Sequence, residues 1–289
     1  MLGSAAGFTH EAQRDGRLGH RKLTEGVASQ RRWPSAFTRE AVGAWQAGSM
    51  CGRYANARSK AQIVADFSVA EKYVELKDLP DYNVTPQKRA PIVLSAAPPE
   101  DAAADPVRQV KLALWGLRPG FLKPEQRGFA NARIEGLAEK RSFAKPLREG
   151  RILVPMSGFY EWWKETDDSG KQINQPYYFT PKDGGVLALA GLMQWAKDPR
   201  DPDKKIPTYT IITTEATDDI GKIHQRMPVI VRPENWGSWL DPSMKDMDTA
   251  QALLATPPSG TLSIVKVATT VNSAKNNGPQ LIEPIEQLA

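Results

Sequence analysis

The sequence contains one cysteine, Cys51, among its 289 residues. A single cysteine excludes an intramolecular disulfide and a cysteine-based zinc site. Histidine is almost as scarce, because only His224 lies beyond the first 49 residues. We therefore expect no metal site and no other cofactor. The lack of disulfides favours a reducing compartment, the cytoplasm.

Long apolar runs are also absent. No stretch approaches the roughly 20 residues of a membrane-spanning helix, and the first 49 residues lack the apolar core of a secretory signal. Positive charge is only in slight excess: with seven basic and four acidic residues, this segment contributes +3 of the net charge of +5 and leaves +2 for the rest. We expect no membrane association, and a face that binds nucleic acid must be local.

Residues 1–49 carry no alternating or helical apolar pattern, which predicts an unstructured leader. A mis-assigned start upstream of the true one, or a removable propeptide, would explain such a segment. The remaining residues, 50–289, suffice for one domain with a single core.

The secondary-structure pattern is dominated by short β-branched and aromatic runs. They predict strands at residues 90–94, 107–115, 151–163, 176–180, 186–195, 208–214 and 262–268. Helical patterns are fewer, at residues 59–67, 134–143, 217–223, 233–240 and 247–255, and polar Pro/Gly-rich loops are expected at 98–106, 164–176 and 197–207. Because strands and helices do not alternate, the pattern favours an α+β fold of curved, mostly antiparallel sheets with short peripheral helices.

Cys51 directly follows Met50, so initiation there and removal of the methionine would give an N-terminal cysteine. Its α-amine, with a reference pKa of about 7.7–8.0, is far more nucleophilic near pH 7 than a lysine at about 10.4. An adjacent amine and thiol suit aldehydes, because the amine forms a Schiff base and the sulfur then closes a stable thiazolidine ring. Taken alone, the Met-Cys pair favours a buried structural cysteine beside a chance methionine.

Five short motifs favour a functional Cys51 over a structural one. They are CGRY at residues 51–54, YNVTP at 82–86, NAR at 131–133, GFYEW at 158–162 and IHQRMP at 223–228. In this order they resemble the SOS-response-associated peptidase (SRAP) family of abasic-site sensors, over a region from Met50 to about residue 272. The resemblance implies an SRAP-like fold and a covalent link between the N-terminal cysteine and abasic sites in single-stranded DNA. It also implies lyase-type chemistry and a peptidase-like cleavage that frees Cys51.

Glu161 lies between Tyr160 and Trp162 on a predicted strand, where a desolvated carboxyl group would have a raised pKa and act as a general acid. Protonation of the ring oxygen would open an abasic deoxyribose to its aldehyde. The sequence alone leaves an outward-facing glutamate equally open, and the resemblance implies a catalytic one.

His224 follows a predicted helix, and imidazole titrates in the range needed to shuttle protons. A lone histidine is more often structural, and again the resemblance implies catalysis. Asn131 is predicted to orient the Cys51 amine by hydrogen bonds, although it is also suited to be the N-cap of the helix expected after it.

A second set of residues is predicted to bind DNA. Arg53 and Arg133 would clamp phosphates, with surface solvation as the alternative. Trp115 would stack on a base, although such a tryptophan more often belongs to the core. Thr213 matches a family threonine near the site, and Pro86 is expected to shape a nearby turn. Two further residues carry weaker expectations: Asn83 is predicted to be structural, and Phe121 stands where the family commonly has tryptophan.

Two other functions remain open from the sequence. One is an N-terminal-nucleophile cysteine amidohydrolase or protease on other substrates, with Cys51 as thiolate and His224 as base. The other is a non-catalytic module that binds single-stranded DNA through basic and aromatic residues. For the leading function we expect a monomer that associates with the nucleoid through DNA, with the replication machinery as a further partner.

Overall fold

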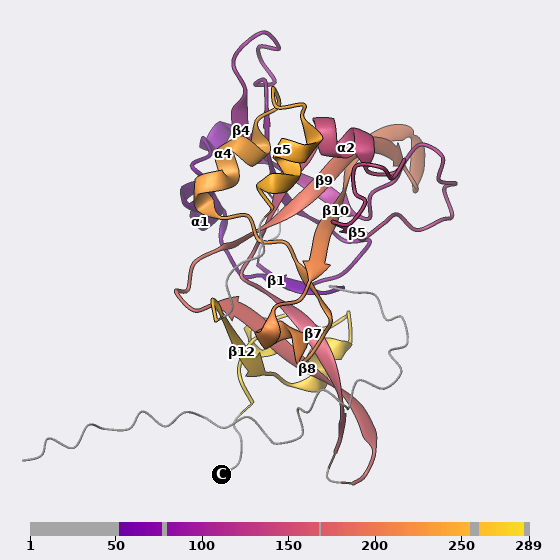
Figure 1. Ribbon diagram of the computed structural model, residues 1–289, viewed down its shortest axis with the longest axis vertical. Coiled ribbons are helices and arrows are strands. Elements are labelled where there is room, and N and C mark those ends of the chain that lie inside the picture. Colours follow the sequence, from indigo (N-terminus) through magenta and orange to yellow (C-terminus); the bar gives the residue numbers. More distant parts are fainter. Residues whose placement is uncertain (1–51, 77–79, 168, 255–259, 286–289) are drawn as a thin grey trace, which may run out of the picture. The chain divides into compact units, whose positions relative to one another are not determined.

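The computed structural model describes residues 52–76, 80–167, 169–254 and 260–285 (Figure 1). Met50, Cys51 and the predicted leader lie outside these residues, so the expectations for them remain predictions.

One sheet has five strands, all antiparallel to their neighbours. Its spatial order is β12 (Leu262–Lys266), β8 (Gln172–Pro181), β7 (Gly158–Thr166), β1 (Tyr54–Asn56) and β2 (Asp81–Val84). β7 and β8 form a long hairpin at the lower end of Figure 1. This sheet contains three of the five motifs, because CGRY, YNVTP and GFYEW overlap β1, β2 and β7.

The second sheet has seven strands and is mixed. Its order is β11 (Arg226–Pro228), β10 (Asp201–Glu215), β4 (Val107–Trp115), β3 (Arg89–Ala96), β6 (Arg151–Met156) and β9 (Leu187–Asp198), with β5 (Asn131–Arg133) paired to β10. β9 also pairs with β10, so the sheet closes on itself. The pairings of β10 with β4 and β5 are parallel.

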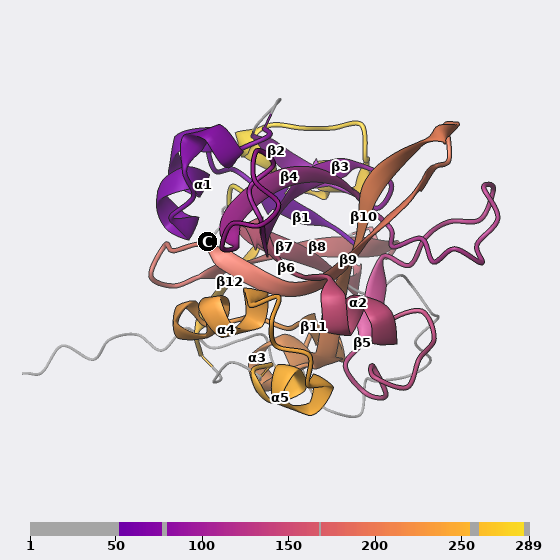
Figure 2. The same ribbon diagram turned by 90° about the horizontal axis from the view of Figure 1, so that it is seen from above.

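One apolar cluster combines side chains of both sheets, including Tyr54, Phe159 and Phe179 from the first and Trp115 and Ile211 from the second. A second cluster joins the other side of the seven-stranded sheet to the helices (Figure 2). The helices are short: α1 (Lys60–Phe67), α2 (Ala144–Glu149), α3 (Asp218–Gly221), α4 (Trp236–Leu240) and α5 (Met247–Ala252), with 3₁₀ turns at Glu71–Tyr73, Pro233–Asn235, Thr269–Asn272 and Pro279–Leu281. Of the candidate catalytic residues that the structure describes, Asn131 and Glu161 lie on strands and His224 lies in a loop.

Helix α1 begins at a capping box. The amide of Gln62 donates to Ser59 Oγ at 3.2 Å, and the amide of Ser59 donates to Gln62 Oε1 at 2.8 Å, which satisfies two amides at the start of the helix. Ile63 and Phe67, four positions apart, lie on one face and are buried. The helix predicted at 59–67 is therefore confirmed.

The predicted α+β class, with mostly antiparallel sheets and short helices, is confirmed, and all seven predicted strand regions contain strands. The run at 151–163 is two strands, β6 and β7, separated at Ser157. The predicted loops at 164–176 and 197–207 do join antiparallel strands, but they are too long, because most of each segment belongs to the paired strands of the β7–β8 or β9–β10 hairpin. The loop at 98–106 is confirmed.

The helix predicted at 134–143 is also wrong. The segment forms turns, Gly136 has φ 64°, and helix α2 begins only at Ala144. The residues before it, Asn131–Arg133, are a strand held in a parallel pairing with β10, so Asn131 is not a helix N-cap.

Candidate active site

Glu161 is positioned by the middle of β7. It pairs with Tyr177 of β8 and is only 3% exposed. Phe159 and Trp163, two residues away on the same side of the strand, pack in the cluster between the two sheets. The carboxyl group therefore points inward, and the alternative of an outward-facing glutamate is wrong.

Asn131 approaches the same cluster from the second sheet. It pairs with Ile211 of β10, and both Ile211 and the preceding residue, Ala130, pack in that cluster. Asn131 is half-buried. His224 follows Ile223, another member of the cluster, and its amide donates to the carbonyl of Ile220 at the end of α3. The structure thus brings Glu161, Asn131 and His224 to the border of one apolar cluster.

The His224 ring is held by the backbone two residues ahead. Nδ1 lies 3.1 Å from both the amide nitrogen and the carbonyl oxygen of Arg226. Burial lowers the pKa of His224, the hydrogen bond to the Arg226 backbone opposes this shift, and the positive charge of Arg226 adds to it. The imidazole is consequently neutral near pH 7, as proton transfer requires.

Arg226 is itself fixed by three contacts. Nη1 and Nη2 donate to the two carboxylate oxygens of Glu135 at 2.6 and 2.8 Å, and Nη2 also donates to the carbonyl of Thr213 at 2.7 Å. The bond to Arg226 lowers the pKa of Glu135. Sequence reasoning missed Glu135, and the available signal was its place two residues after the NAR motif.

A second polar cluster surrounds Arg53. Its Nη1 donates to Asn83 Oδ1 and to the carbonyl of Val271, both at 2.7 Å, and its Cζ lies 5.5 Å from the ring centroid of Trp162. The Trp162 indole donates to Asn272 Oδ1 at 2.6 Å. Burial lowers the pKa of Arg53. Three motifs and residues 271–272 thus each supply one part of this cluster.

Asn83 is structural, as predicted. It is fully buried, and its Nδ2 donates to the carbonyls of Ser273 and Asn276 at 3.0 and 2.8 Å. Pro86 lies in a turn, also as predicted, in which the amide of Lys88 donates to the carbonyl of Thr85 at 3.0 Å.

Trp115 corrects a prediction. The side chain is 0% exposed, donates from Nε1 to the carbonyl of Ala130 at 2.8 Å, and stacks on Tyr209 with ring centroids 6.2 Å apart. No face of the indole is open to a nucleic-acid base, so the stacking role expected for Trp115 is wrong and the core role holds.

Of the remaining residues singled out from the sequence, one is buried and two are exposed. Thr213 is buried, and its hydroxyl donates to the carbonyl of Ala132 at 3.5 Å. Arg133 is exposed at the end of β5. Phe121 is 50% exposed and lies beneath the guanidinium of Arg141, with Cζ 5.4 Å from the ring centroid.

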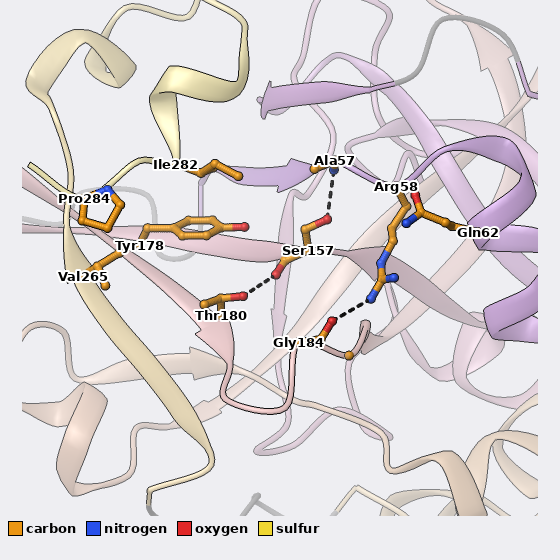
Figure 3. Close-up of a pocket in the computed structure, with 11 residues that line it drawn as sticks. Ala57, Arg58, Gln62, Ser157, Tyr178, Thr180, Gly184, Val265, Ile282 and Pro284 are labelled. Atoms are coloured by element: carbon orange, nitrogen blue, oxygen red, sulfur yellow. Dashed lines mark hydrogen bonds between the residues drawn. The ribbon is translucent and has the colours of Figure 1, made fainter.

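A separate cavity of about 420 Å³ lies on the other side of the five-stranded sheet (Figure 3). Its wall includes Tyr178, which alternates with Tyr177 and so faces away from Glu161. Polar groups around it are bonded to one another: the amide of Ala57 donates to Ser157 Oγ and the Thr180 hydroxyl donates to the carbonyl of Ser157, both at 3.0 Å. Among the described residues predicted for catalysis, none of Asn131, Glu161 and His224 lines this cavity.

Within the described ranges, no group of three or more His, Cys, Asp or Glu side chains is arranged to hold a metal ion. Among the helices described, none has the length and apolar character needed to cross a membrane.

Comparison with known proteins gives consistent results. A family model described as SOS response associated peptidase (SRAP) matches residues 50–274. The abasic site processing protein YoqW of Bacillus subtilis (strain 168) is 35% identical over 237 residues, which cover 81% of this chain and 99% of that protein. The abasic site processing protein HMCES of Pongo abelii is 30% identical over 240 residues, 73% of this chain and 66% of that protein.

Solved structures agree on the fold. A crystal structure of a protein from Bacteroides thetaiotaomicron has a TM-score of 0.64 at 22% identity and covers 82% of this chain and 100% of its own. A phage-related protein from Bordetella bronchiseptica has a TM-score of 0.57 at 25% identity, with 75% and 94% covered.

Proposed function

Because this chain belongs to the SOS response associated peptidase (SRAP) family, as its five motifs predicted, we propose that it processes abasic sites in DNA by capturing them covalently on Cys51. The observation that carries the proposal is that Glu161 faces inward and that neighbours of Glu161, Asn131 and His224 in the chain or in the sheet pack in the same apolar cluster. The family match begins at residue 50, directly before the cysteine. The relatives named above are called abasic site processing proteins.

The chemistry begins with the sugar, which is mostly a closed hemiacetal. Glu161, in its protonated form, gives its proton to the ring oxygen, the C–O bond to that oxygen breaks, and the anomeric hydroxyl loses its proton to water, which leaves the aldehyde. The Cys51 amine adds to the carbonyl carbon, and the adduct loses water to form an imine. The thiol then adds its sulfur to the imine carbon and its proton to the nitrogen, which closes the thiazolidine.

The other side chains serve these steps. Neutral His224 accepts the proton released by the attacking amine and returns it when water leaves. Asn131 holds the amine through its amide group. Because the same groups catalyse the reverse steps, we expect slow release of the link.

We propose that the substrate strand is single-stranded and that Arg133 binds a flanking phosphate from the exposed end of β5. Arg53 would contribute positive charge next to Trp162 while its Nη1 remains bonded to Asn83 and Val271. We also propose that the protein acts as a monomer and that replication proteins recruit it.

The reaction requires a free amine on Cys51, since an amide nitrogen does not form an imine. If residues 1–49 are translated, a peptidase-like self-cleavage before Cys51 must remove them. We propose this processing as the second activity, and intact mass of the purified native protein tests it by identifying the first residue.

The central experiment incubates protein beginning at Cys51 with single-stranded DNA that carries one abasic site. We expect an adduct stable to denaturation. Cys51→Ser keeps the amine but lacks the thiol, so it should give only an imine that is lost unless reduced. Turnover of amide substrates without any adduct would instead support an N-terminal-nucleophile hydrolase.

An extension test isolates the amine. One uncleavable residue added before Cys51 should abolish the adduct and leave reversible affinity for single-stranded DNA largely intact. Undiminished adduct formation by the extended protein would contradict the role of the amine.

A further inference from the structure

The hairpin of β9 and β10 continues beyond the seven-stranded sheet as a two-stranded ribbon (Figure 2). β9 pairs with β6 only as far as Leu192, and β10 pairs with β4 from Thr208 onward. Between these points, the two strands have only each other as strand partners in the described part of the chain. Because this ribbon leaves the body of the sheet, one of its faces has no layer packed against it.

That face continues the side of the sheet that is buried elsewhere. Met193 and Tyr209 are opposite each other and belong to the central cluster. The next residues on the same side are Trp195, opposite Pro207, and then Lys197, opposite Lys205. Trp195 is 57% exposed, the highest value among the large apolar side chains described.

Lys197 and Lys205 place two like charges directly opposite each other in the strand pair. Like charges directly opposite on neighbouring strands, with Cβ atoms about 4.5–5.5 Å apart, destabilise the pairing. Lys197 and Lys205 are both exposed, and neither has an ion pair among the described residues. The ladder therefore carries an unfavourable charge pair about 7 Å along the strand from an exposed indole.

Among the described residues, no acidic side chain forms an ion pair with Lys197 or Lys205, although the exposed Asp203 lies two residues before Lys205. Asp198 is bound by Arg89 at 3.1 Å, and Asp201 is bound by Lys204 at 2.8 Å. An aromatic face flanked by unpaired cations matches a nucleic-acid strand, whose bases stack on aromatic rings and whose phosphates attract cations.

We propose that this face, formed by Trp195, Lys197 and Lys205, binds unpaired nucleotides of the DNA strand away from the lesion. The proposal rests on the function proposed above, to which it adds a second contact for the same strand. An indole stacks most readily on a base that has no partner, so the occupant is single-stranded rather than duplex DNA. The ribbon would extend the length of strand that the protein covers and contribute affinity without taking part in the covalent chemistry.

The test measures reversible binding of mature protein to an undamaged, fluorescently labelled single strand of about 20 nucleotides by anisotropy. Trp195→Ala should weaken binding about tenfold, and Trp195→Phe should retain most of the affinity. The double variant Lys197→Ala/Lys205→Ala should reduce the slope of log K against log salt by about 1.4, at roughly 0.7 per phosphate contact. Lys204→Ala is the matched control and should change neither quantity.

Adduct formation on a short abasic oligonucleotide should be unchanged in all these variants, and their thermal unfolding should match the wild type. Affinity of Trp195→Ala within twofold of the wild type would overturn the proposal, as would an equal loss in Lys204→Ala. Dependence on Trp195 for duplex DNA alone would overturn the single-strand assignment. If the wild type forms no adduct while the binding effects are observed, the proposed function fails and the ribbon contact stands.

Discussion

Arg226 and Glu135, 91 positions apart in the chain, form a bidentate ion pair with N–O distances of 2.6 and 2.8 Å. The same arginine supplies the backbone amide that lies 3.1 Å from His224 Nδ1. Glu135 is thus connected to the candidate proton shuttle through one residue, and its charge offsets that of Arg226. We therefore predict that Glu135 positions His224.

Glu135→Gln should keep the fold and slow adduct formation severalfold. An ion pair with one exposed partner contributes at most about 1 kcal/mol to stability, but loss of its charge leaves Arg226 uncompensated beside the imidazole. Because the charge of Arg226 already lowers the pKa of His224, the pH–rate profile should shift to lower pH. The measurement is single-turnover adduct formation across pH, with exposed Glu139→Gln as control. A slower rate with no shift of the profile would indicate a merely structural role.

Glu161→Gln should slow adduct formation by about 10²–10⁴-fold, because the amide cannot donate a proton to the ring oxygen. The matched control is Glu165→Gln on the same side of β7, where the carboxylate is bonded to Tyr177 and Lys266. Gel quantification of the denaturation-stable adduct gives both rates. Equal rates for wild type and Glu161→Gln would leave Glu161 without a catalytic role.

The lowered pKa of His224 also predicts a pH dependence of stability. The fold favours the neutral ring, so the unfolded chain binds the proton more readily. This contribution is complete above the unfolded pKa of about 6.5 and is lost as the pH falls through that value toward the folded pKa. Urea unfolding between pH 5 and 8 should therefore show a decrease on the acid side that is smaller in His224→Gln. Identical pH profiles for the two proteins would show that the ring does not contribute.

Trp115→Ala should lower the free energy of unfolding by about 3–5 kcal/mol, the usual cost of removing a buried aromatic side chain. Trp115→Phe should lower the free energy of unfolding by less. Its remaining cost comes chiefly from the carbonyl of Ala130, which loses the indole donor. Denaturant titration measures both changes. Affinity for single-stranded DNA per folded molecule should not change, and a selective loss of affinity at full stability would restore the base-stacking role.

Strands could be predicted from the sequence where the residues of the strand themselves show a β-branched and apolar pattern. β3 and β4 were recognisable because β-branched and apolar residues at 90–94 and 107–115 form strands that are buried in the sheet. The loops predicted at 164–176 and 197–207 extend too far because most of their side chains are polar, and the strand pairing of these segments depends on the partner strand. β5 was missed for a related reason, since three residues in a parallel pairing with a distant strand carry no periodicity of their own.

The candidate site was likewise predictable in part, because some of its residues lie in recognisable motifs and others depend on contacts between distant segments. Motif identity and order indicated Glu161, Asn131 and His224, and the structure places them around one cluster. The partnership of Glu135 with Arg226 had no counterpart in local sequence, because it joins the turn after β5 to the start of β11. The core position of Trp115 was the more common alternative from the sequence, but its packing against Tyr209 was inaccessible, since it depends on the register of β4 and β10.

The bond from Arg53 to the carbonyl of Val271 spans 218 positions. A ribosome makes the chain from its amino end, so Arg53 emerges with Asn83 soon after it but long before Val271. A partly made polypeptide would therefore hold Arg53 by only one of the two bonds to Nη1, and the second forms only after residue 271 has left the exit tunnel.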